Sequence, residues 1–262
     1  MSAKAARSAK AIAQNIQHPD SYIARVLREL NMPQDAFNPV GEWSHTYIDG
    51  SSFFALGRVQ GTLKIKRDMN GALHIVNSRP TVDRGYRFFT IARLESLSDE
   101  LSTPRSWEVH SKIAADIDAP AYLNTGLHKR FKVENGLLSI ASGAHRQTLT
   151  LKGRYTCKHA LLDAVQRLPG ADVPALKFTM LDEYDQPCPD QRLRLRCKTK
   201  ATFKNGTGEV YVFDQIGFAT VPATFCVDSS GRLLAYVAGM QSLILYSENG
   251  IKTGYADVDI VE

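Results

Sequence analysis

The chain has 262 residues, of which 44% are hydrophobic and 23% are charged, and this composition excludes a disordered protein. The 32 Lys and Arg residues only slightly outnumber the 27 Asp and Glu residues, so the charge balance does not by itself indicate nucleic-acid binding. Because no run of about 18 apolar residues occurs, we expect no membrane-spanning helix.

The N-terminal region predicts helix and linker. Residues 3–17 are rich in alanine and lack the apolar stretch of about 7–15 residues that a secretory signal needs. Apolar residues then recur at helical spacing: Ile23, Val26, Leu27 and Leu30. We expect residues 1–41 to be a helical segment with a linker at 33–41. The absence of a signal favours a cytoplasmic protein, with an exported form whose signal has been removed as the alternative.

From Trp43 onward the hydrophobic period changes to two, which is typical of strands. Asn-Gly pairs favour type I′ hairpin turns, because both central residues of such a turn need positive φ. The sequence has four of them: Asn70-Gly71, Asn135-Gly136, Asn205-Gly206 and Asn249-Gly250. The first three lie between strand-like runs, and a turn at residues 228–231 joins two more runs. Residues 42–262 are therefore predicted to form one antiparallel β domain with a dozen or more strands.

One helix interrupts the run of strands. Between Cys157 and Leu168, leucine and valine residues follow helical spacing, and Pro169-Gly170 ends the pattern. We expect this internal helix to cover the open side of a strongly bent sheet, since an uncovered concave apolar face would be sticky. The predicted fold is all-β, mainly antiparallel, a large barrel or half-barrel with an N-terminal helical segment and one internal plugging helix. A two-sheet sandwich is the alternative.

Two stretches of the sequence carry a resemblance. Residues 159–169, with the strand at 176–181, and the strand–turn–strand at 222–234 resemble uncharacterised bacterial proteins of lipocalin-like or half-barrel appearance. The resemblance covers the layout of residues 55–247 and implies the same fold. Members of that group usually look exported, whereas this chain shows no signal. The shared motifs are structural, so the resemblance implies no catalytic residue.

The internal helix also carries the predicted catalytic group. His159 and Asp163 stand at i and i+4, which places both on one helix face, and Tyr155 precedes them. A histidine beside a carboxylate that faces a cavity can act as a base with an orienting partner. We therefore place any chemistry at the cavity mouth beneath this helix. A capping or surface role for these residues is the alternative.

Two further sets are predicted to contact a ligand. Trp43, His45 and Tyr47 alternate on one strand face, and aromatic rings with polar tips are typical pocket lining. The alternative is an aromatic core layer. Trp107 and His110 form the second set, in which Glu108 shares a face with His110 and is able to orient its imidazole. An exposed Glu–His pair would look the same in the sequence.

Metal, cofactor and nucleic-acid sites are not predicted. Neither the histidines nor the four cysteines have metal-ligand spacing, and the cysteines are expected to be reduced and largely buried. Nucleotide-binding glycine motifs are missing. Cations do alternate along one predicted strand: Arg192, Arg194, Arg196, Lys198, Lys200 and Lys204. Because no aromatic residue interleaves with them, we interpret this face as a solvated one and do not expect nucleic acid.

The sequence leaves two function classes open. The first is a protein that binds an apolar or aromatic small molecule in the cavity of a lipocalin-like barrel. The second is a cofactor-independent enzyme, a lyase, isomerase or cyclase, that uses the same cavity. The fold cannot choose between them. A wholly apolar interior would favour binding, and a buried histidine beside a carboxylate or tyrosine would favour catalysis.

Overall fold

The computed structural model describes residues 19–51, 59–81, 85–169, 175–239 and 241–246. Fifteen strands form one sheet. The strands are β1 (Trp43–Ser51), β2 (Val59–Arg67), β3 (Leu73–Pro80), β4 (Arg87–Ser96), β5 (Pro104–Ala114), β6 (Leu127–Glu134), β7 (Leu137–Ser142), β8 (His145–Thr150), β9 (Tyr155–Cys157), β10 (Leu176–Asp182), β11 (Gln186–Phe203), β12 (Gly206–Ile216), β13 (Ala223–Asp228), β14 (Leu233–Ala238) and β15 (Gln241–Leu245). The helices are α2 (Pro19–Glu29) and α3 (Lys158–Ala164), with 3-10 turns η1 (Tyr122–Asn124) and η2 (Val165–Arg167).

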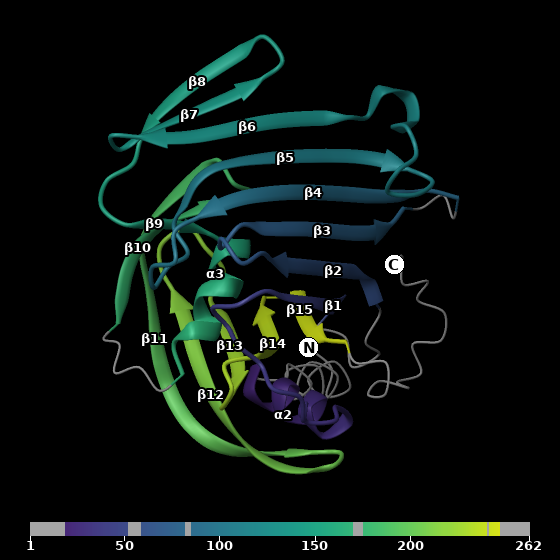
Figure 1. The fold of residues 1–262 in the computed structure, drawn as a ribbon, viewed down its shortest axis with the longest axis vertical. Coiled ribbons are helices and arrows are strands. Elements are labelled where there is room, and N and C mark those ends of the chain that lie inside the picture. Colours follow the sequence, from purple (N-terminus) through teal and green to yellow (C-terminus); the bar gives the residue numbers. More distant parts are fainter. Residues whose placement is uncertain (1–18, 52–58, 82–84, 170–174, 240, 247–262) are drawn as a thin grey trace, which may run out of the picture.

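The sheet has a linear strand order that runs from β8 through β1 and β15 to β9. Neighbouring strands are antiparallel, except that β9 pairs with β10 in parallel. β1 joins the two halves of the sheet by pairing with β2 on one side and with β15 on the other. The sheet bends strongly, so that β4 and β5 face β10 and β11 across its concave side (Figure 1). The predicted β-barrel-like architecture, mainly antiparallel with an internal helix, is therefore confirmed.

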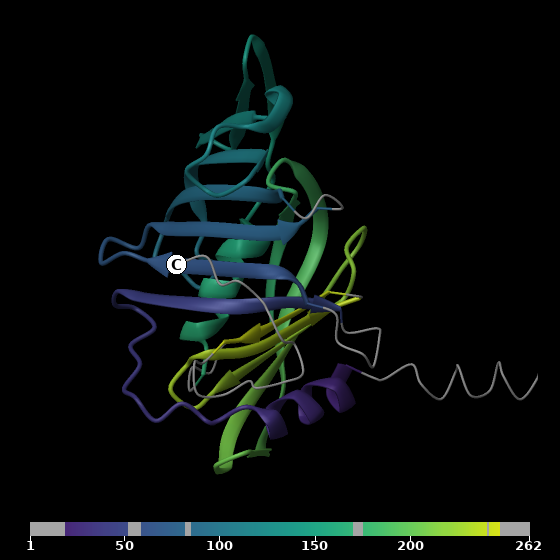
Figure 2. The ribbon, with the colours of Figure 1, turned by 90° about the vertical axis from the view of Figure 1, so that its right-hand side faces the viewer.

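The two helices cover opposite faces of the sheet. α3 lies inside the bend, and α2 lies outside it, against the half formed by β11 to β15 (Figures 1 and 2). The apolar stripe of α2 is buried as predicted, and the Tyr22 hydroxyl lies 2.9 Å from the Ser242 hydroxyl of β15. Within the described residues, no helix is long and apolar enough to span a membrane.

Burial differs between the two halves of the sheet. β13 is buried at every position and β14 at all but its last, because both of their faces are covered. In β5, by contrast, Trp107 and Val109 are buried whereas Glu108 and His110 are exposed. The half of the sheet that contains β13 and β14 thus forms the thick core of the molecule, and the half that contains β5 offers one face to solvent.

The predicted hairpins are present, but their turns differ from the prediction. Of the described Asn-Gly pairs, only Asn135-Gly136 has positive φ at both residues, 50° and 75°, as a type I′ turn requires. Asn70 and Asn205 do not have positive φ. The Asn205 side chain instead accepts a hydrogen bond from the Met32 backbone nitrogen at 2.7 Å, which ties the hairpin to the segment after α2. Asn249-Gly250 lies outside the described residues.

Several other predictions can be placed. The predicted helix at 3–17 lies outside the described residues. Three of the four cysteines are buried, but Cys197 is exposed, because it lies on the solvent side of β11 where the strand shifts register. The predicted single cationic face of β11 is not formed. The register shift between Leu195 and Cys197 puts Arg192 and Arg194 on the opposite face of the strand from Lys198 and Lys200. These four cations are exposed, but Arg196 is only partly exposed and lies 3.4 Å from Asp214. Lys198 pairs with Glu209 of β12 at 2.8 Å.

Candidate functional site

A small hollow lies at the N-terminal end of α3. β9 contributes three residues that pair with β10, and the chain turns into α3 directly after Cys157, whose backbone is still extended. The helix then buries Leu161 and Leu162 in the core and leaves Lys158 and His159 at its first turn, beside the hollow. Local packing of the leucines therefore holds these two polar side chains in place.

His159 is bonded to a tyrosine rather than to a carboxylate. Its Nδ1 lies 2.6 Å from the Tyr184 hydroxyl, and the two rings stack with centroids 5.4 Å apart. With Nδ1 engaged, Nε2 is the ring nitrogen left to face the hollow, and it makes no hydrogen bond to the described residues. Burial, with help from the nearby Lys158 charge, lowers the pKa of His159 to about 3. Burial raises the pKa of Tyr184 well above its usual value, so both groups are neutral at neutral pH.

Tyr184 sits in an unusual backbone conformation. It follows Glu183 in the turn between β10 and β11, and the two residues have φ of 46° and 72°. The Asp185 backbone nitrogen donates to the Asp182 carbonyl oxygen at 3.1 Å, which closes a type I′ turn without asparagine or glycine. A bulky residue with positive φ is strained and persists only where its surroundings hold it. Burial and the bond to His159 supply that hold.

Lys158 is a partly buried cation without a carboxylate in direct contact. Its ammonium donates to the Gln241 side-chain oxygen and lies 5.3 Å from the centre of the Tyr236 ring. Among the described residues it forms no ion pair. Burial lowers its pKa, against the opposing field of Asp49. Asp49 itself is occupied, because it accepts from Arg79 at 2.8 Å and from the Gln241 amide at 3.0 Å.

The space beside these groups, which we call the α3 hollow, has a volume of about 150 Å³. Its lining mixes charged, polar and apolar side chains: Asn77, Arg79, Phe88, Thr90, Cys157, Lys158, His159, Leu181, Asp182, Glu183, Tyr184 and Gln241. The sequence predicted polar side chains at a cavity mouth here and left open whether the interior is wholly apolar. The structure shows an apolar wall formed by Phe88 and Leu181 beside a polar one.

Asp163 does not join His159. It is buried and holds a network of its own, in which Arg67 of β2 lies 3.3 Å away, Arg167 of η2 donates to it, and the Ser102 hydroxyl donates at 2.5 Å. The Arg67 guanidinium also donates to the Gly41 carbonyl oxygen at 2.9 Å. This network ties α3 to β2 and to the loop before β5, so Asp163 is a structural residue in this arrangement.

Tyr155 and the aromatic set of Trp43, His45 and Tyr47 line neither the α3 hollow nor the larger hollow described next. The Tyr155 hydroxyl donates to the Pro104 carbonyl oxygen at 2.8 Å, and burial raises its pKa to about 12. Trp43 and His45 stack with centroids 5.0 Å apart, and Trp43 and Tyr47 are buried. Of the predicted catalytic group, the structure therefore brings only His159 to a hollow, and the aromatic core layer is the arrangement seen for Trp43, His45 and Tyr47.

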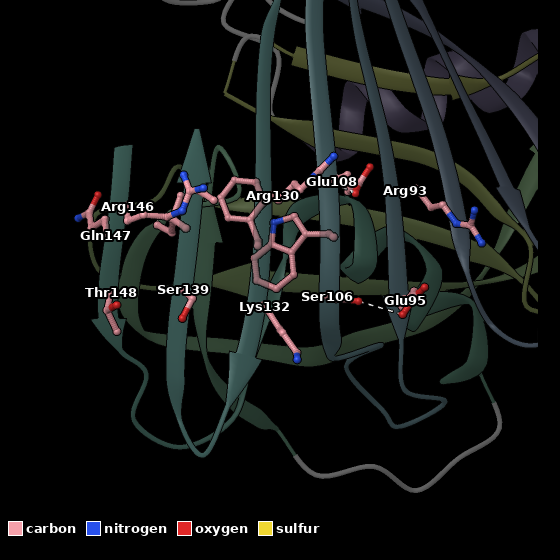
Figure 3. A pocket seen from close by; sticks show the side chains of 14 residues that line it. Arg93, Glu95, Ser106, Glu108, Arg130, Lys132, Ser139, Arg146, Gln147 and Thr148 are labelled. Atoms are coloured by element: carbon pink, nitrogen blue, oxygen red, sulfur yellow. Dashed lines mark hydrogen bonds and ion pairs between the residues drawn. The ribbon is translucent and has the colours of Figure 1, made fainter. Parts of the chain in front are cut away.

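A larger hollow lies on the solvent face of β4 to β8, and we call it the outer hollow. Its volume is about 650 Å³. Two rows of side chains cross the strands over it, Arg93, Glu108, Arg130 and Arg146 in one and Glu95, Ser106, Lys132, Ser139 and Thr148 in the other (Figure 3). Trp107, Phe131 and Ile140 lie beneath it and belong to the core.

The predicted Glu108–His110 pair is formed beside the outer hollow, and a second histidine joins it. His110 Nε2 lies 4.0 Å from a Glu108 carboxylate oxygen. The register of β5 and β6 sets His128 directly opposite His110, and the two rings stack with centroids 3.9 Å apart. The other Glu108 oxygen forms an ion pair with Arg130, whose Nε lies 3.2 Å away. Trp107, predicted with His110, stacks on Phe131 with centroids 5.0 Å apart.

Sequence reasoning missed three residues that matter here. Lys158 directly precedes the predicted His159, and a cation at the start of a buried helix was the available signal. Tyr184 was hidden because Asp182, Glu183 and Asp185 were interpreted only as a turn. His128 could be found only through the register of β5 and β6, which the sequence does not state.

Comparison with known proteins shows a likeness of fold. No protein-family model and no curated protein matches the chain. The crystal structure of a beta-barrel-like protein of domain of unknown function DUF1849 from Brucella abortus matches with a TM-score of 0.50 at 12% identity, over 79% of this chain and 98% of that one. A DUF1089 family protein from Pseudomonas aeruginosa matches with a TM-score of 0.38 at 12% identity, over 79% and 96%. The first match shows that the chain is similar in fold to a beta-barrel-like bacterial protein of a domain of unknown function.

Proposed function

We propose that this protein binds a small organic acid in the α3 hollow, on a barrel-like scaffold used in the manner of a lipocalin. One observation carries the proposal: Lys158 is a partly buried ammonium with no carboxylate in direct contact among the described residues. Buried lysines are almost always paired with an anion. A ligand carboxylate would supply that partner.

The shape of the α3 hollow supports a compact ligand. A cavity of about 150 Å³ accommodates a molecule the size of benzene. Phe88 and Leu181 offer an apolar wall to the ring or short chain of such a ligand. The His159 Nε2 is available for one further hydrogen bond. An aromatic or short aliphatic carboxylate satisfies the ammonium, the imidazole and the apolar wall together.

The His159–Tyr184 pair favours a second candidate function, a cofactor-independent enzyme. Histidine and tyrosine are both side chains that transfer protons in acid–base catalysis. Yet a base works best when its pKa is near the working pH, and burial holds the pKa of His159 near 3. The imidazole therefore suits a neutral hydrogen-bonding role, and we place binding first.

Isothermal titration calorimetry with benzoate tests the proposal. Benzamide serves as the neutral probe of nearly the same shape. We expect saturable one-to-one binding of benzoate, and roughly a tenfold or greater loss of affinity in Lys158→Met, since a charge-assisted bond contributes about 1.5–3 kcal/mol. Lys177→Met, at an exposed lysine of β10, is the matched control and should bind as the wild type does. Equal binding of benzoate and benzamide, or by Lys158→Met and wild type, would contradict the proposal.

Native mass spectrometry of protein purified from its own host separates the two candidates. A binding protein releases its retained ligand chemically unchanged after prolonged incubation. An enzyme converts added ligand, and the conversion stops in His159→Gln while the melting temperature stays within a few degrees. Conversion in the wild type that is absent from His159→Gln would move the enzyme to first place.

A further inference from the structure

The cluster of Glu108, His110 and His128 lies outside the proposed ligand site. It combines two imidazoles and one carboxylate, whose ligand atoms all lie within 4.8 Å of one another. Within the described part of the chain, this is the one group of metal-ligating side chains so arranged. We propose that it is a site for a divalent transition-metal ion, zinc by its ligand type, with a coordination position open toward an anion in the outer hollow.

The distances fit a metal after rotation of the side chains. The Nε2 atoms of His110 and His128 lie 4.0 Å and 3.8 Å from the same Glu108 oxygen. Zinc bonds of about 2.0–2.1 Å place neighbouring tetrahedral ligand atoms about 3.4 Å apart, so these two separations need to shorten by about half an ångström. The two imidazoles stack with an interplanar angle of 13°, so they must also turn out of the stack before both Nε2 lone pairs point at one ion. His110 and His128 lie directly opposite one another on β5 and β6, and Glu108 is two positions before His110, so the three side chains start on one face of the sheet.

The hydrogen bonding of the cluster leaves the required atoms available. The Nε2 of His128 is buried and has no hydrogen-bond partner among the described residues. Arg130 engages one Glu108 oxygen, which leaves the oxygen nearest the two imidazoles for a metal. A buried polar atom without a partner is costly, and a metal ion at this point would remove that cost.

Three protein ligands leave zinc one position for water or a ligand, as in catalytic rather than structural zinc sites. Glu108 also lines the outer hollow. Cations surround that hollow: Arg93, Arg130, Lys132 and Arg146. An anion bound in the hollow is therefore the class of molecule that would complete the coordination.

The test uses the full chain without an affinity tag, titrated with Zn²⁺ by calorimetry and with Co²⁺ by visible absorption. We expect one equivalent to bind, with the weak bands of nitrogen and oxygen coordination. His128→Gln and Glu108→Gln should each weaken Zn²⁺ binding at least tenfold. Losing even a residue that only orients a metal ligand costs about 10- to 100-fold in affinity, and these two residues are proposed as ligands themselves. His74→Gln, at a partly exposed histidine bonded to Asp68, is the matched control and should leave binding unchanged.

Four outcomes would overturn the proposal. They are no saturable binding of Zn²⁺, unchanged affinity in His128→Gln, equal loss in His74→Gln, or thiolate charge-transfer bands with Co²⁺ that disappear in Cys197→Ser. The last would assign the metal to the exposed cysteine instead. Because the cluster is largely exposed, the melting temperatures of all variants are expected to match the wild type, and that measurement accompanies each titration.

Discussion

The α3 hollow and the outer hollow contain the same kinds of side chain in opposite surroundings. In the α3 hollow, His159 and Tyr184 are desolvated, and the pKa of the histidine is held near 3. On the outer face, the side chains of Glu108 and His110 are about half exposed, at 52% and 50%. One set of groups is fixed and neutral, and the other is free to exchange water for a ligand.

This difference follows from what covers each part of the sheet. α3 and the strands around it exclude water from one end of the concave side, so a charge there needs a partner from the protein or from a bound ligand. Nothing among the described residues covers the solvent face of β4 to β8. Residue type alone therefore does not decide the chemistry of a histidine, because burial sets its protonation state and its partner.

The largest loss in the free energy of unfolding is expected where a substitution leaves buried charges without their partner. Asp163→Asn leaves Arg67 and Arg167 without their carboxylate in the core, and we expect the free energy of unfolding to fall by about 3–5 kcal/mol. Urea denaturation measures this. Glu100→Gln, which removes an exposed ion pair with Arg154, should change it by less than about 1 kcal/mol. Equal effects of the two substitutions would show that the Asp163 network is not what holds α3.

Acid should lower the free energy of unfolding through the buried imidazole of His159. The imidazole of His159 has a pKa near 6.5 in the unfolded chain and about 3 in the folded one, so between these values the unfolded state binds the extra proton. The contribution of the neutral His159 imidazole to the free energy of unfolding is complete above pH 6.5 and is lost as the pH falls toward 3. From pH 6.5 to 4.5 the loss is about 2 kcal/mol.

Denaturation curves at several pH values check this expectation. His159→Gln should lower stability at pH 7 but flatten its dependence on pH. His145→Gln, at an exposed position of β8 whose side chain makes no hydrogen bond to the described residues, should keep the slope of the wild type. A slope in His159→Gln as steep as that of the wild type would mean that His159 is not desolvated in the folded protein.

The hydroxyl of Tyr184 provides a smaller effect in the α3 hollow. Tyr184→Phe keeps the stacked ring but leaves His159 Nδ1 without its partner, and it should cost about 1–2 kcal/mol. Tyr86→Phe, at a partly exposed ring that packs at a tilt against Tyr122, should cost much less. Thermal denaturation compares them. If the two substitutions have equal effects, the Tyr184–His159 hydrogen bond is not formed in solution.

The smallest effect is expected on the outer face. His110→Gln removes an exposed side chain with no hydrogen bond among the described residues, so the free energy of unfolding should change by no more than about 0.5 kcal/mol. The same urea denaturation measures it. A loss of more than about 2 kcal/mol would mean that the stacked histidines are part of the fold, as the α3 residues are, and the contrast between the two regions would fail.

Much of the fold could be predicted from the sequence because its signals are local. The alternation from Trp43 onward and the leucine spacing of residues 157–168 identified strands and the internal helix. Turn types were less predictable, because Asn205 bonds to Met32, 173 positions away, instead of adopting positive φ. Glu183 and Tyr184 adopt positive φ without any of the usual turn residues.

The candidate site was predicted only in part for a related reason. Helical spacing correctly placed His159 at the internal helix, but it could not say which neighbour each side chain meets. Asp163 turns toward Arg67, and His159 toward Tyr184, through contacts between residues far apart in the chain. His128 lies opposite His110 only because β5 and β6 pair in that register.

The most direct test of the central claim is a ¹⁵N NMR titration of the histidine ring nitrogens with benzoate. If benzoate binds beside Lys158, the ¹⁵N chemical shifts of the His159 nitrogens should change saturably, more at Nε2 than at the Nδ1 bonded to Tyr184. Those of His110 and His128 should stay unchanged in metal-free protein. The shift should be absent in Lys158→Met. Benzoate-dependent shifts at His110 and His128 without any at His159, or no saturable shift at His159, would contradict it.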